Sequence, residues 1–233
     1  MNKIQKAALI GAGAVGAYFI WGLSEKMGDN FCVVASGERK SRLEQNGIVI
    51  NKKRYQLNVK TSREAGIQDL ILVSCKSDAL KDLLADIKVL TGPDTLILSL
   101  LNGVSSEEII GIEIGMEHMA YAVMRIASVR DGNKIVFSEK NTAGIYVGEK
   151  DCEEPTDRLK AFEELLKDTG IRYNFVGNII LDMWMKYASN VAQNLPQAIL
   201  SVGFKAYKDS EHVHFIAEKL WKEVAAVANA KGI

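Results

Sequence analysis

The stretch IQKAALIGAGAVGAYFIWGLSEK at residues 4–26 indicates how the N-terminal part of the chain folds. It begins with Ile4 to Ile10, which we predict to be a buried strand, and it ends with Ala14 to Lys26, which we predict to be helical. Between the two lie three glycines in the spacing Gly-x-Gly-x-x-Gly, namely Gly11, Gly13 and Gly16. In such a turn the first glycine permits the bend, the second lets the backbone approach a phosphate, and the third allows the helix to pack on the strand. The stretch therefore predicts a dinucleotide-binding turn that holds a pyrophosphate at the helix N-terminus, and a glycine-rich turn without a ligand is the alternative.

The following sequence repeats this alternation of strand and helix. Further strands are predicted at Phe31 to Ala35, at Leu70 to Ser74, and at Leu96 to Leu100 after a turn at Gly92-Pro93-Asp94. Helices are predicted around Glu38 to Gln45 and from Asp78 to Ile87, and a hairpin joins Ile48 to Ile50 with Tyr55 to Val59 through Asn51-Lys52-Lys53. Strands separated by helices form parallel sheets that are covered on both faces. We therefore expect an α/β fold with an N-terminal Rossmann-type, doubly wound sheet.

The character of the sequence changes near residue 177. More β-rich sequence extends to about Gly148, and a helix is predicted from Pro155 to Thr169. Beyond it the strand patterns stop, and helices are predicted from Ile180 to Leu195 and from Ser210 to Ala230. We predict a dinucleotide-binding domain at residues 1–176, followed by an all-helical domain at residues 177–233.

The composition is that of an ordinary globular protein and argues against several kinds of partner. The 233 residues carry 29 Lys and Arg against 29 Asp and Glu, so no net charge steers the chain to nucleic acid or to an anionic membrane. Cys32, Cys75 and Cys152 form no pairwise motif, and the three His suggest no metal site. Lys3 and Lys6 precede an uncharged stretch that imitates a signal peptide, but its glycines and its length argue against that interpretation. We expect a cytoplasmic protein that holds no metal.

The end of the second strand bears on the choice of cofactor. A site for NAD carries Asp or Glu at the tip of this strand, about 20 residues after the glycine turn. Here the tip reads Ala35-Ser36-Gly37-Glu38-Arg39-Lys40, with no acid at the tip itself. Ser36 can donate a hydrogen bond to a ribose 2′-phosphate, and Arg39 can pair with its charge. This favours NADP(H), while a solvated helix start is the alternative for the two cations.

A lysine and two asparagines share one face of the helix predicted from Ile180. Lys186, Asn190 and Asn194 are spaced by four residues, so they form a ridge. The ammonium can protonate a carbonyl oxygen as it becomes an alkoxide, and the amides can hold a carboxylate or a hydroxyl. The ridge therefore suits a 2-keto acid, and a solvated polar stripe is the alternative.

Two polar positions lie at the ends of predicted parallel strands. Lys76 ends the strand from Leu70 to Cys75, and Asn102-Gly103 ends the strand from Leu96 to Leu100. Because ligands bind at the carboxyl ends of strands in open α/β sheets, these positions and the glycine turn describe one crevice. A polar residue that merely terminates a strand is the alternative for each.

Taken together, these residues resemble the ketopantoate reductases, the 2-dehydropantoate 2-reductase family. The resemblance spans nearly the whole chain and is carried by Gly11 to Gly16, Lys76, Leu101-Asn102-Gly103, Arg130-Asp131-Gly132-Asn133, Trp184 to Asn194, and Glu223-Val224-Ala225 through Gly232-Ile233. It implies an NADPH-dependent reduction of 2-dehydropantoate to pantoate, a step toward pantothenate and coenzyme A. It also implies a Rossmann domain followed by an all-helical domain.

The resemblance also implies roles for individual residues. Lys186 corresponds to the proton donor to the C2 oxygen, Asn102 to a residue that touches both nicotinamide and substrate, and Asn190 and Asn194 to substrate-binding asparagines. Lys76 corresponds to a lysine on the cofactor side, and Ser128 falls in a loop that contributes backbone to the cofactor site. The predicted cofactor-binding residues are Gly11, Ala12, Gly13, Ala14, Val15, Gly16, Ser36, Arg39, Lys76, Asn102 and Ser128.

Two features depart from the family pattern. Ser36 stands where many members carry Arg, which leaves Arg39 as the cation for the 2′-phosphate. The chain ends at Gly232-Ile233, whereas the family continues through helices that supply a glutamate behind the catalytic lysine and a substrate-binding serine. We therefore expect a C-terminally truncated chain with an incomplete helical domain.

Other functions stay open from the sequence. The chain could reduce another branched or aromatic 2-keto acid, or it could be a non-catalytic module that binds NADP(H) without turnover. A structural protein with an empty crevice is the third alternative. We expect a small-molecule 2-keto acid and NADP(H) as partners, without nucleic acid or membrane, and we leave a homodimer open as the assembly.

Overall fold

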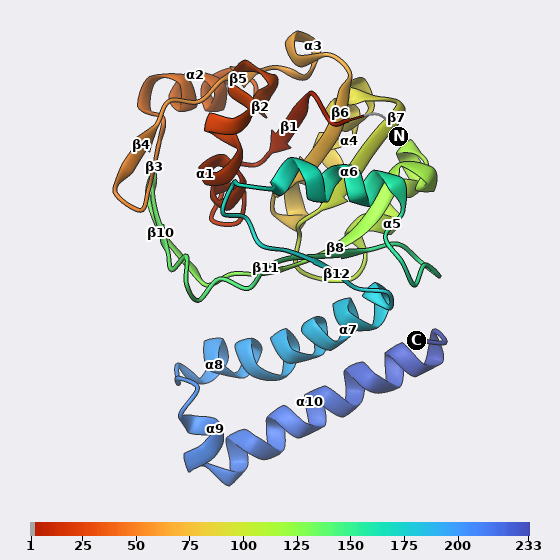
Figure 1. The fold of residues 1–233 in the computed structure, drawn as a ribbon. Helices are drawn as coiled ribbons and strands as arrows, with labels where there is room; N and C mark the ends of the chain where they lie inside the picture. The colour runs from red at the N-terminus through yellow and green to blue at the C-terminus, as the bar shows by residue number, and fades with distance from the viewer. Residues whose placement is uncertain (1–2) are drawn as a thin grey trace. The chain divides into compact units, whose positions relative to one another are not determined.

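The computed structural model describes residues 3–233, whose contacts divide the chain into two compact units (Figure 1). Unit 1 holds the chain up to Leu101 together with Ser105–Ile179. Unit 2 holds the short segment Asn102–Val104 together with Ile180–Ile233. Each unit has buried apolar side chains of its own.

An eight-stranded sheet forms the centre of unit 1 within the described residues. Across the sheet the strands are β12 (Tyr173–Phe175), β11 (Gly144–Gly148), β8 (Met119–Arg125), β7 (Thr91–Ser99), β6 (Gln68–Val73), β1 (Ala7–Ile10), β2 (Phe31–Val34) and β5 (Val59–Lys60). All neighbouring pairs from β8 to β5 are parallel, and only β11 runs antiparallel to β8. The chain moves from β1 to β2 on one side and later to β6 on the other, so the strand order reverses at β1. This reversal is where ligands bind in open α/β sheets.

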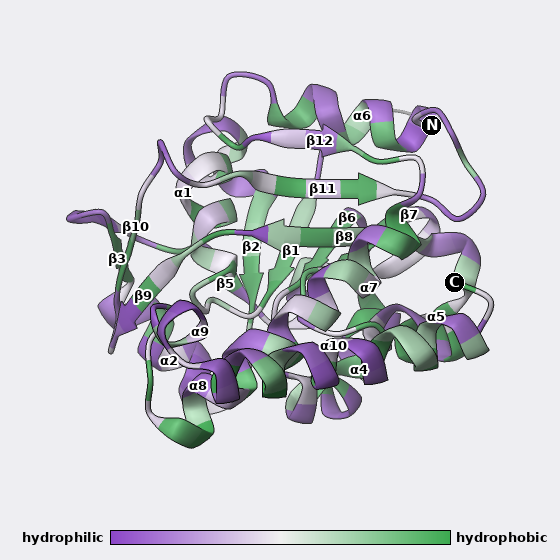
Figure 2. Cartoon of the chain, turned by 90° about the horizontal axis from the view of Figure 1, so that it is seen from below, coloured by the Kyte–Doolittle hydropathy of each residue, from purple (hydrophilic) through white to green (hydrophobic). Residues whose placement is uncertain are grey.

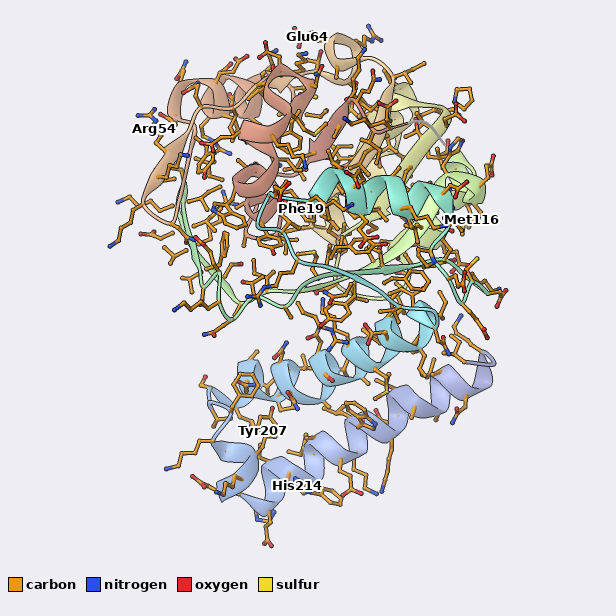
Figure 3. All side chains as sticks on the ribbon, viewed as in Figure 1. Phe19, Arg54, Glu64, Met116, Tyr207 and His214 are labelled. Atoms are coloured by element: carbon orange, nitrogen blue, oxygen red, sulfur yellow. The ribbon has the colours of Figure 1, made fainter. Side chains whose placement is uncertain are left out.

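Helices cover both faces of this sheet, as the alternation predicts. They are α1 (Gly16–Met27), α2 (Gly37–Asn46), α3 (Ser62–Ala65), α4 (Leu80–Leu90), α5 (Ser106–Ile114) and α6 (Asp157–Leu166), with 3₁₀ turns at η1 (Gly28–Asn30), η2 (Ser77–Ala79) and η3 (Met116–His118). One apolar cluster joins Leu9 of β1 to Phe19 of α1 and Phe162 of α6, and Figure 3 labels Phe19 inside unit 1. The opposite cluster joins Ile10 of β1 to Ile87 of α4 and to α5. The central strands, such as β1, β2 and β6, are apolar on both faces because each face is covered, and they are mostly green in Figure 2. The predicted doubly wound fold is confirmed.

A smaller, four-stranded sheet has the order β4 (Lys53–Tyr55), β3 (Ile48–Ile50), β10 (Lys134–Phe137) and β9 (Ser128–Asp131). The predicted hairpin is right in its first strand and wrong in its second, because Tyr55 to Val59 is not one strand. Residues 53–55 pair with β3, whereas β5 at Val59–Lys60 joins the edge of the large sheet beside β2. The turn needs only two residues because Asn51 and Lys52 both adopt positive φ, 47° and 73°, as tight hairpin turns require.

The predicted turn at Gly92-Pro93-Asp94 is wrong, because these residues belong to β7. The register between β6 and β7 shifts between Gln68 and Leu70. The Thr95 hydroxyl bridges this irregularity, since it accepts from the Gly92 N–H at 2.8 Å and donates to the Gln68 carbonyl at 2.6 Å. The strand therefore starts earlier than its apolar residues indicate.

Unit 2 is helical throughout, apart from its connections, as the sequence predicts from residue 178 onward. Its elements are α7 (Ile179–Ser189), whose first residue groups with unit 1, the π-helical turn η4 (Asn190–Asn194), α8 (Leu195–Leu200), α9 (Ala206–Asp209) and α10 (Glu211–Ala230). Trp184, Ala188 and Val224 form its buried centre, so α7 packs against α10. Within residues 3–233 no helix has both the length and the apolar composition needed to cross a membrane.

The helix predicted from Ile180 to Leu195 is not a regular α-helix over its last turn. Pro196 has no N–H to donate to the carbonyl four residues earlier, and the chain widens into η4 just before it. The Tyr207 hydroxyl donates to the Gln193 carbonyl, which supplies a partner to an acceptor in this turn. Figure 3 labels Tyr207 and His214 in this part of unit 2.

Candidate active site

The glycine turn between β1 and α1 is packed so tightly at two positions that no side chain fits. Gly11 has φ +102°, and a Cβ atom there would lie 2.5 Å from the carbonyl oxygen of Ser74. A Cβ atom on Gly16 would lie 2.1 Å from the carbonyl oxygen of Gly11. Gly13 differs, because a Cβ atom there would meet no protein atom closer than 4.0 Å. The protein itself therefore requires glycine at positions 11 and 16, whereas the space at Gly13 is open.

The backbone N–H groups of this turn lack protein partners. Within residues 3–233, the N–H groups of Gly13, Ala14 and Val15 make no hydrogen bond. Helix α1 also begins without a side-chain cap and without an acidic residue in its first turn. Unpaired N–H groups at a helix N-terminus attract anions, through hydrogen bonds and through the helix dipole. The turn is thus suited to hold a phosphate group above Gly13.

The predicted cofactor-side cations lie near the ends of the neighbouring strands. Ser36 follows β2 and precedes α2, and both Ser36 and Arg39 are exposed. Burial raises the pKa of the Cys75 thiol in the loop after β6, while a backbone hydrogen bond at Cys75 and the Arg39 charge partly lower it. Lys76 is exposed in that same loop, three residues after β6 ends rather than at the strand end as predicted.

In unit 2 the side chains of Lys186 and Asn102 are in contact. The Lys186 ammonium donates to the amide oxygen of Asn102, with Nζ and Oδ1 2.9 Å apart. Lys186 is half-buried on α7, and Asn102 belongs to the three-residue segment 102–104 that packs with the helices. Val104 of that segment contacts the apolar cluster around Trp184, which explains why the segment groups with unit 2. This hydrogen bond holds the Lys186 ammonium in a defined position beside the Asn102 amide.

Asn190 and Asn194 contact each other across the π-helical turn η4. The side-chain amide of Asn194 donates to the side-chain oxygen of Asn190 at 3.0 Å. Asn190 is half-buried and Asn194 is exposed. π-helical turns recur at functional sites because the widened backbone redirects side chains. The two amides stay adjacent, as the spacing of four predicts, although the helix around them is not regular.

Arg130 lies beside the glycine turn, and the sequence pattern indicates no role for its side chain. Its Nη1 atom is 4.0 Å from the position that a Cβ atom would take on Gly13. Ser128, which the sequence places near the cofactor, is half-buried two residues earlier on the same strand β9. The signal that could have revealed Arg130 is strand alternation, since it shares a face with Ser128.

A buried polar cluster lies at the start of α5, and the sequence pattern does not predict it. Ser99, Ser106 and Glu107 form a chain of hydrogen bonds, 2.8 Å between the serine hydroxyls and 2.8 Å from Ser106 to the carboxylate. Glu107 is 1% exposed, and within residues 3–233 its second oxygen has no hydrogen-bond partner. Burial raises the pKa of the Glu107 carboxyl to about 7. Nothing in the local pattern distinguishes it from Glu108, which is exposed.

The family of the chain follows from comparison with known proteins. Residues 7–151, more than half of the chain, match the family model described as ketopantoate reductase PanE/ApbA. The chain belongs to the ketopantoate reductase family. It is 28% identical over 232 residues to the 2-dehydropantoate 2-reductase of Pyrococcus horikoshii. The aligned residues cover 98% of this chain and 75% of that protein.

Solved structures of ketopantoate reductases share the fold. The structure of 2-dehydropantoate 2-reductase from Geobacter metallireducens superimposes with a TM-score of 0.82 at 23% identity, covering 97% of this chain and 76% of that one. D-mandelate dehydrogenase, solved with NADH and anilino(oxo)acetate, superimposes equally well, with a TM-score of 0.82 at 24% identity over 98% of this chain and 75% of that one. These structures support the mixed α/β fold with a parallel-dominated sheet followed by helices. That the natural chain continues beyond Ile233 stays a prediction.

Proposed function

We propose that this member of the ketopantoate reductase family reduces 2-dehydropantoate to pantoate with NADPH, a step toward pantothenate and coenzyme A. The observation that carries the proposal is the 2.9 Å hydrogen bond from Lys186 to Asn102. These residues lie 84 positions apart, and the family resemblance assigns both of them to the same reaction. The name of the Pyrococcus horikoshii relative supports this substrate.

The glycine turn fits the phosphates of a dinucleotide. The unpaired N–H groups of Gly13, Ala14 and Val15 are donors for a pyrophosphate, and the open space at Gly13 allows it to approach. We assign the cofactor to the glycine turn, Ser36, Arg39, Lys76, Asn102 and Ser128. NADP is favoured over NAD because the tip of β2 presents Ser36 and Arg39 and no acid.

The reduction needs a hydride and a proton. When bound, NADPH supplies the hydride that C2 of the keto acid accepts. Lys186 gives a proton to the C2 oxygen, which leaves a hydroxyl on the product and a neutral amine that regains its proton from water. The Asn102 oxygen orients the ammonium, and the amides of Asn190 and Asn194 hold the substrate carboxylate and hydroxyl.

The proposal is tested by following NADPH oxidation with a panel of 2-keto acids. We expect the highest kcat/KM with 2-dehydropantoate, and lower values with NADH than with NADPH. The panel includes phenylglyoxylate, the keto acid that corresponds to mandelate, because a D-mandelate dehydrogenase shares the fold. A higher kcat/KM with phenylglyoxylate would change the proposed substrate and leave the proposed reaction, reduction of a 2-keto acid, in place. If the protein bound NADPH but reduced none of the keto acids, the proposed activity would be wrong and the protein would be a cofactor-binding module.

Replacement of Gly13 by alanine separates cofactor binding from folding. A methyl group at this position meets no protein atom within 4.0 Å, so the free energy of unfolding should stay within about 0.5 kcal/mol of wild type. The same methyl group would occupy space that a pyrophosphate needs, so we expect the Kd for NADPH to rise about tenfold or more, equivalent to about 1.4 kcal/mol. Fluorescence titration with NADPH and urea denaturation measure the two effects. Unchanged NADPH affinity in Gly13→Ala would place the cofactor elsewhere.

A further inference from the structure

Arg130 is brought to the glycine turn by the pairing of β9 with β10. Arg130 lies opposite Ile135, and Ser128 lies opposite Phe137 in this antiparallel pair. Residues directly opposite each other share a face of the sheet, so Arg130 is on the face of the buried Ile135 and Phe137. The Phe137 ring packs edge-on against Tyr18 of α1, with the ring centroids 5.4 Å apart. This face therefore packs on the same helix whose first residues form the turn.

Within residues 3–233 the Arg130 guanidinium forms a hydrogen bond through Nε, and its two Nη atoms are available to a ligand. Its Nε donates to the carbonyl oxygen of Gly132 at 2.9 Å, which fixes the plane of the group. Within residues 3–233 neither Nη atom makes a hydrogen bond or an ion pair. Guanidinium groups with two free parallel N–H donors bind phosphate oxygens in bidentate fashion. Arg130 is thus a preformed anion-binding group.

Arg130 faces the same open space at Gly13 that the unpaired N–H groups of the glycine turn line. Its Nη1 atom and the Ser74 carbonyl oxygen are each 4.0 Å from the position of a Cβ on Gly13, and the N–H groups of residues 13–15 are unpaired there. A pyrophosphate carries two phosphates, of which the N–H groups of the turn can hold one. We propose that Arg130 binds the pyrophosphate of the cofactor across the glycine turn. This rests on the proposed function only in so far as a dinucleotide occupies the turn.

The proposal is tested by cofactor binding to Arg130→Met, Arg130→Lys and Lys134→Met. Lys134 is the matched control, because it is an exposed cation on the same hairpin whose side chain alternates to the opposite face. We expect Arg130→Met to raise the Kd for NADPH about tenfold or more, and Arg130→Lys to raise it less, because lysine keeps the charge and loses the fork. Lys134→Met should leave the Kd within about twofold of wild type. Isothermal titration calorimetry in the absence of substrate measures the Kd for NADPH of each variant.

Comparing ligands with and without a pyrophosphate shows which part of the cofactor Arg130 contacts. Adenosine 2′-monophosphate should bind Arg130→Met as well as it binds wild type, whereas ADP-ribose should lose affinity as NADPH does. Unchanged NADPH affinity in Arg130→Met, or an equal loss for adenosine 2′-monophosphate, would overturn the assignment of Arg130 to the pyrophosphate. If wild-type protein bound neither NADPH, NADH nor ADP-ribose, the proposed function itself would fail, and that result differs from a defect confined to Arg130→Met. Thermal melting of each variant verifies that it is folded.

Discussion

Substitution of Lys186 by alanine is expected to lower kcat for the reduction of 2-dehydropantoate by about 10²–10³-fold, with little change in NADPH affinity. A donor placed where negative charge develops contributes about 3–4 kcal/mol to the transition state, and Lys186→Ala removes both the donor and its proton. The hydrogen bond to Asn102 at 2.9 Å, which orients the ammonium, is lost as well. Steady-state kinetics at saturating NADPH, together with cofactor titration, check both parts of the expectation.

Chemical rescue separates proton donation by Lys186 from a packing effect. Small primary amines, added as their ammonium ions, should restore part of the kcat of Lys186→Ala, because they can occupy the space vacated by the side chain. Lys208→Met is the control in the same unit, since Lys208 is exposed on α9. A kcat near the wild-type value in Lys186→Ala would remove this residue from the mechanism, and a loss that amines do not relieve would make its role one of positioning.

Substitution of Glu107 by glutamine is expected to stabilise the protein above pH 7, by about 3 kcal/mol relative to wild type. The pKa of Glu107 is raised from 4.5 to about 7 in the folded protein because the carboxyl is buried. Below pH 4.5 the group is protonated in both states and contributes nothing. Between pH 4.5 and about pH 7 the folded protein binds more protons than the unfolded chain, so the free energy of unfolding falls as the pH rises. Above pH 7 this free energy is lower by the full amount of about 3 kcal/mol.

Urea denaturation between pH 5 and pH 8 measures this effect as the difference between wild type and variant. The difference should grow with pH in Glu107→Gln, since glutamine has no proton to lose. Glu108→Gln provides the matched control, because Glu108 occupies the next position of the same helix and is exposed. It should change stability by less than about 0.5 kcal/mol at every pH. A difference that does not vary with pH would show that Glu107 is ionised throughout.

Much of the fold of unit 1 could be predicted because its signals are local. The apolar strand before Gly11 and the helix after Gly16 can be recognised from a window of about 20 residues. The errors lie where a distant partner decides the outcome. Tyr55 to Val59 has the composition of one strand, yet its two ends pair in different sheets. Asn190 to Asn194 has helical spacing, but Pro196 and the hydroxyl of Tyr207 favour a π-helical turn.

The candidate site divides in the same way. Steric reasons require glycine at positions 11 and 16, and the local pattern already indicates them. The roles of Ser36, Arg39, Lys76 and Ser128 toward a cofactor, and of Asn190 and Asn194 toward a substrate, stay predictions. Arg130 belongs to a stretch that carries the family resemblance, but the sequence indicates no role for its side chain, and Glu107 is one of many glutamates in the chain. Their neighbours make them unusual, and those neighbours come from other parts of the chain.

The glycine turn, the alternation of strands and helices, and the helical character of the chain after residue 178 can all be inferred from the sequence alone. These features depend on side-chain periodicity and backbone freedom, which act over a few neighbouring residues. Tertiary packing is needed to place Arg130 beside Gly13, to bring the Asn102 side chain to Lys186, and to bury the Glu107 carboxyl. Such contacts join residues far apart in the chain, and they form because the apolar faces of strands and helices pack together, which no short segment specifies alone.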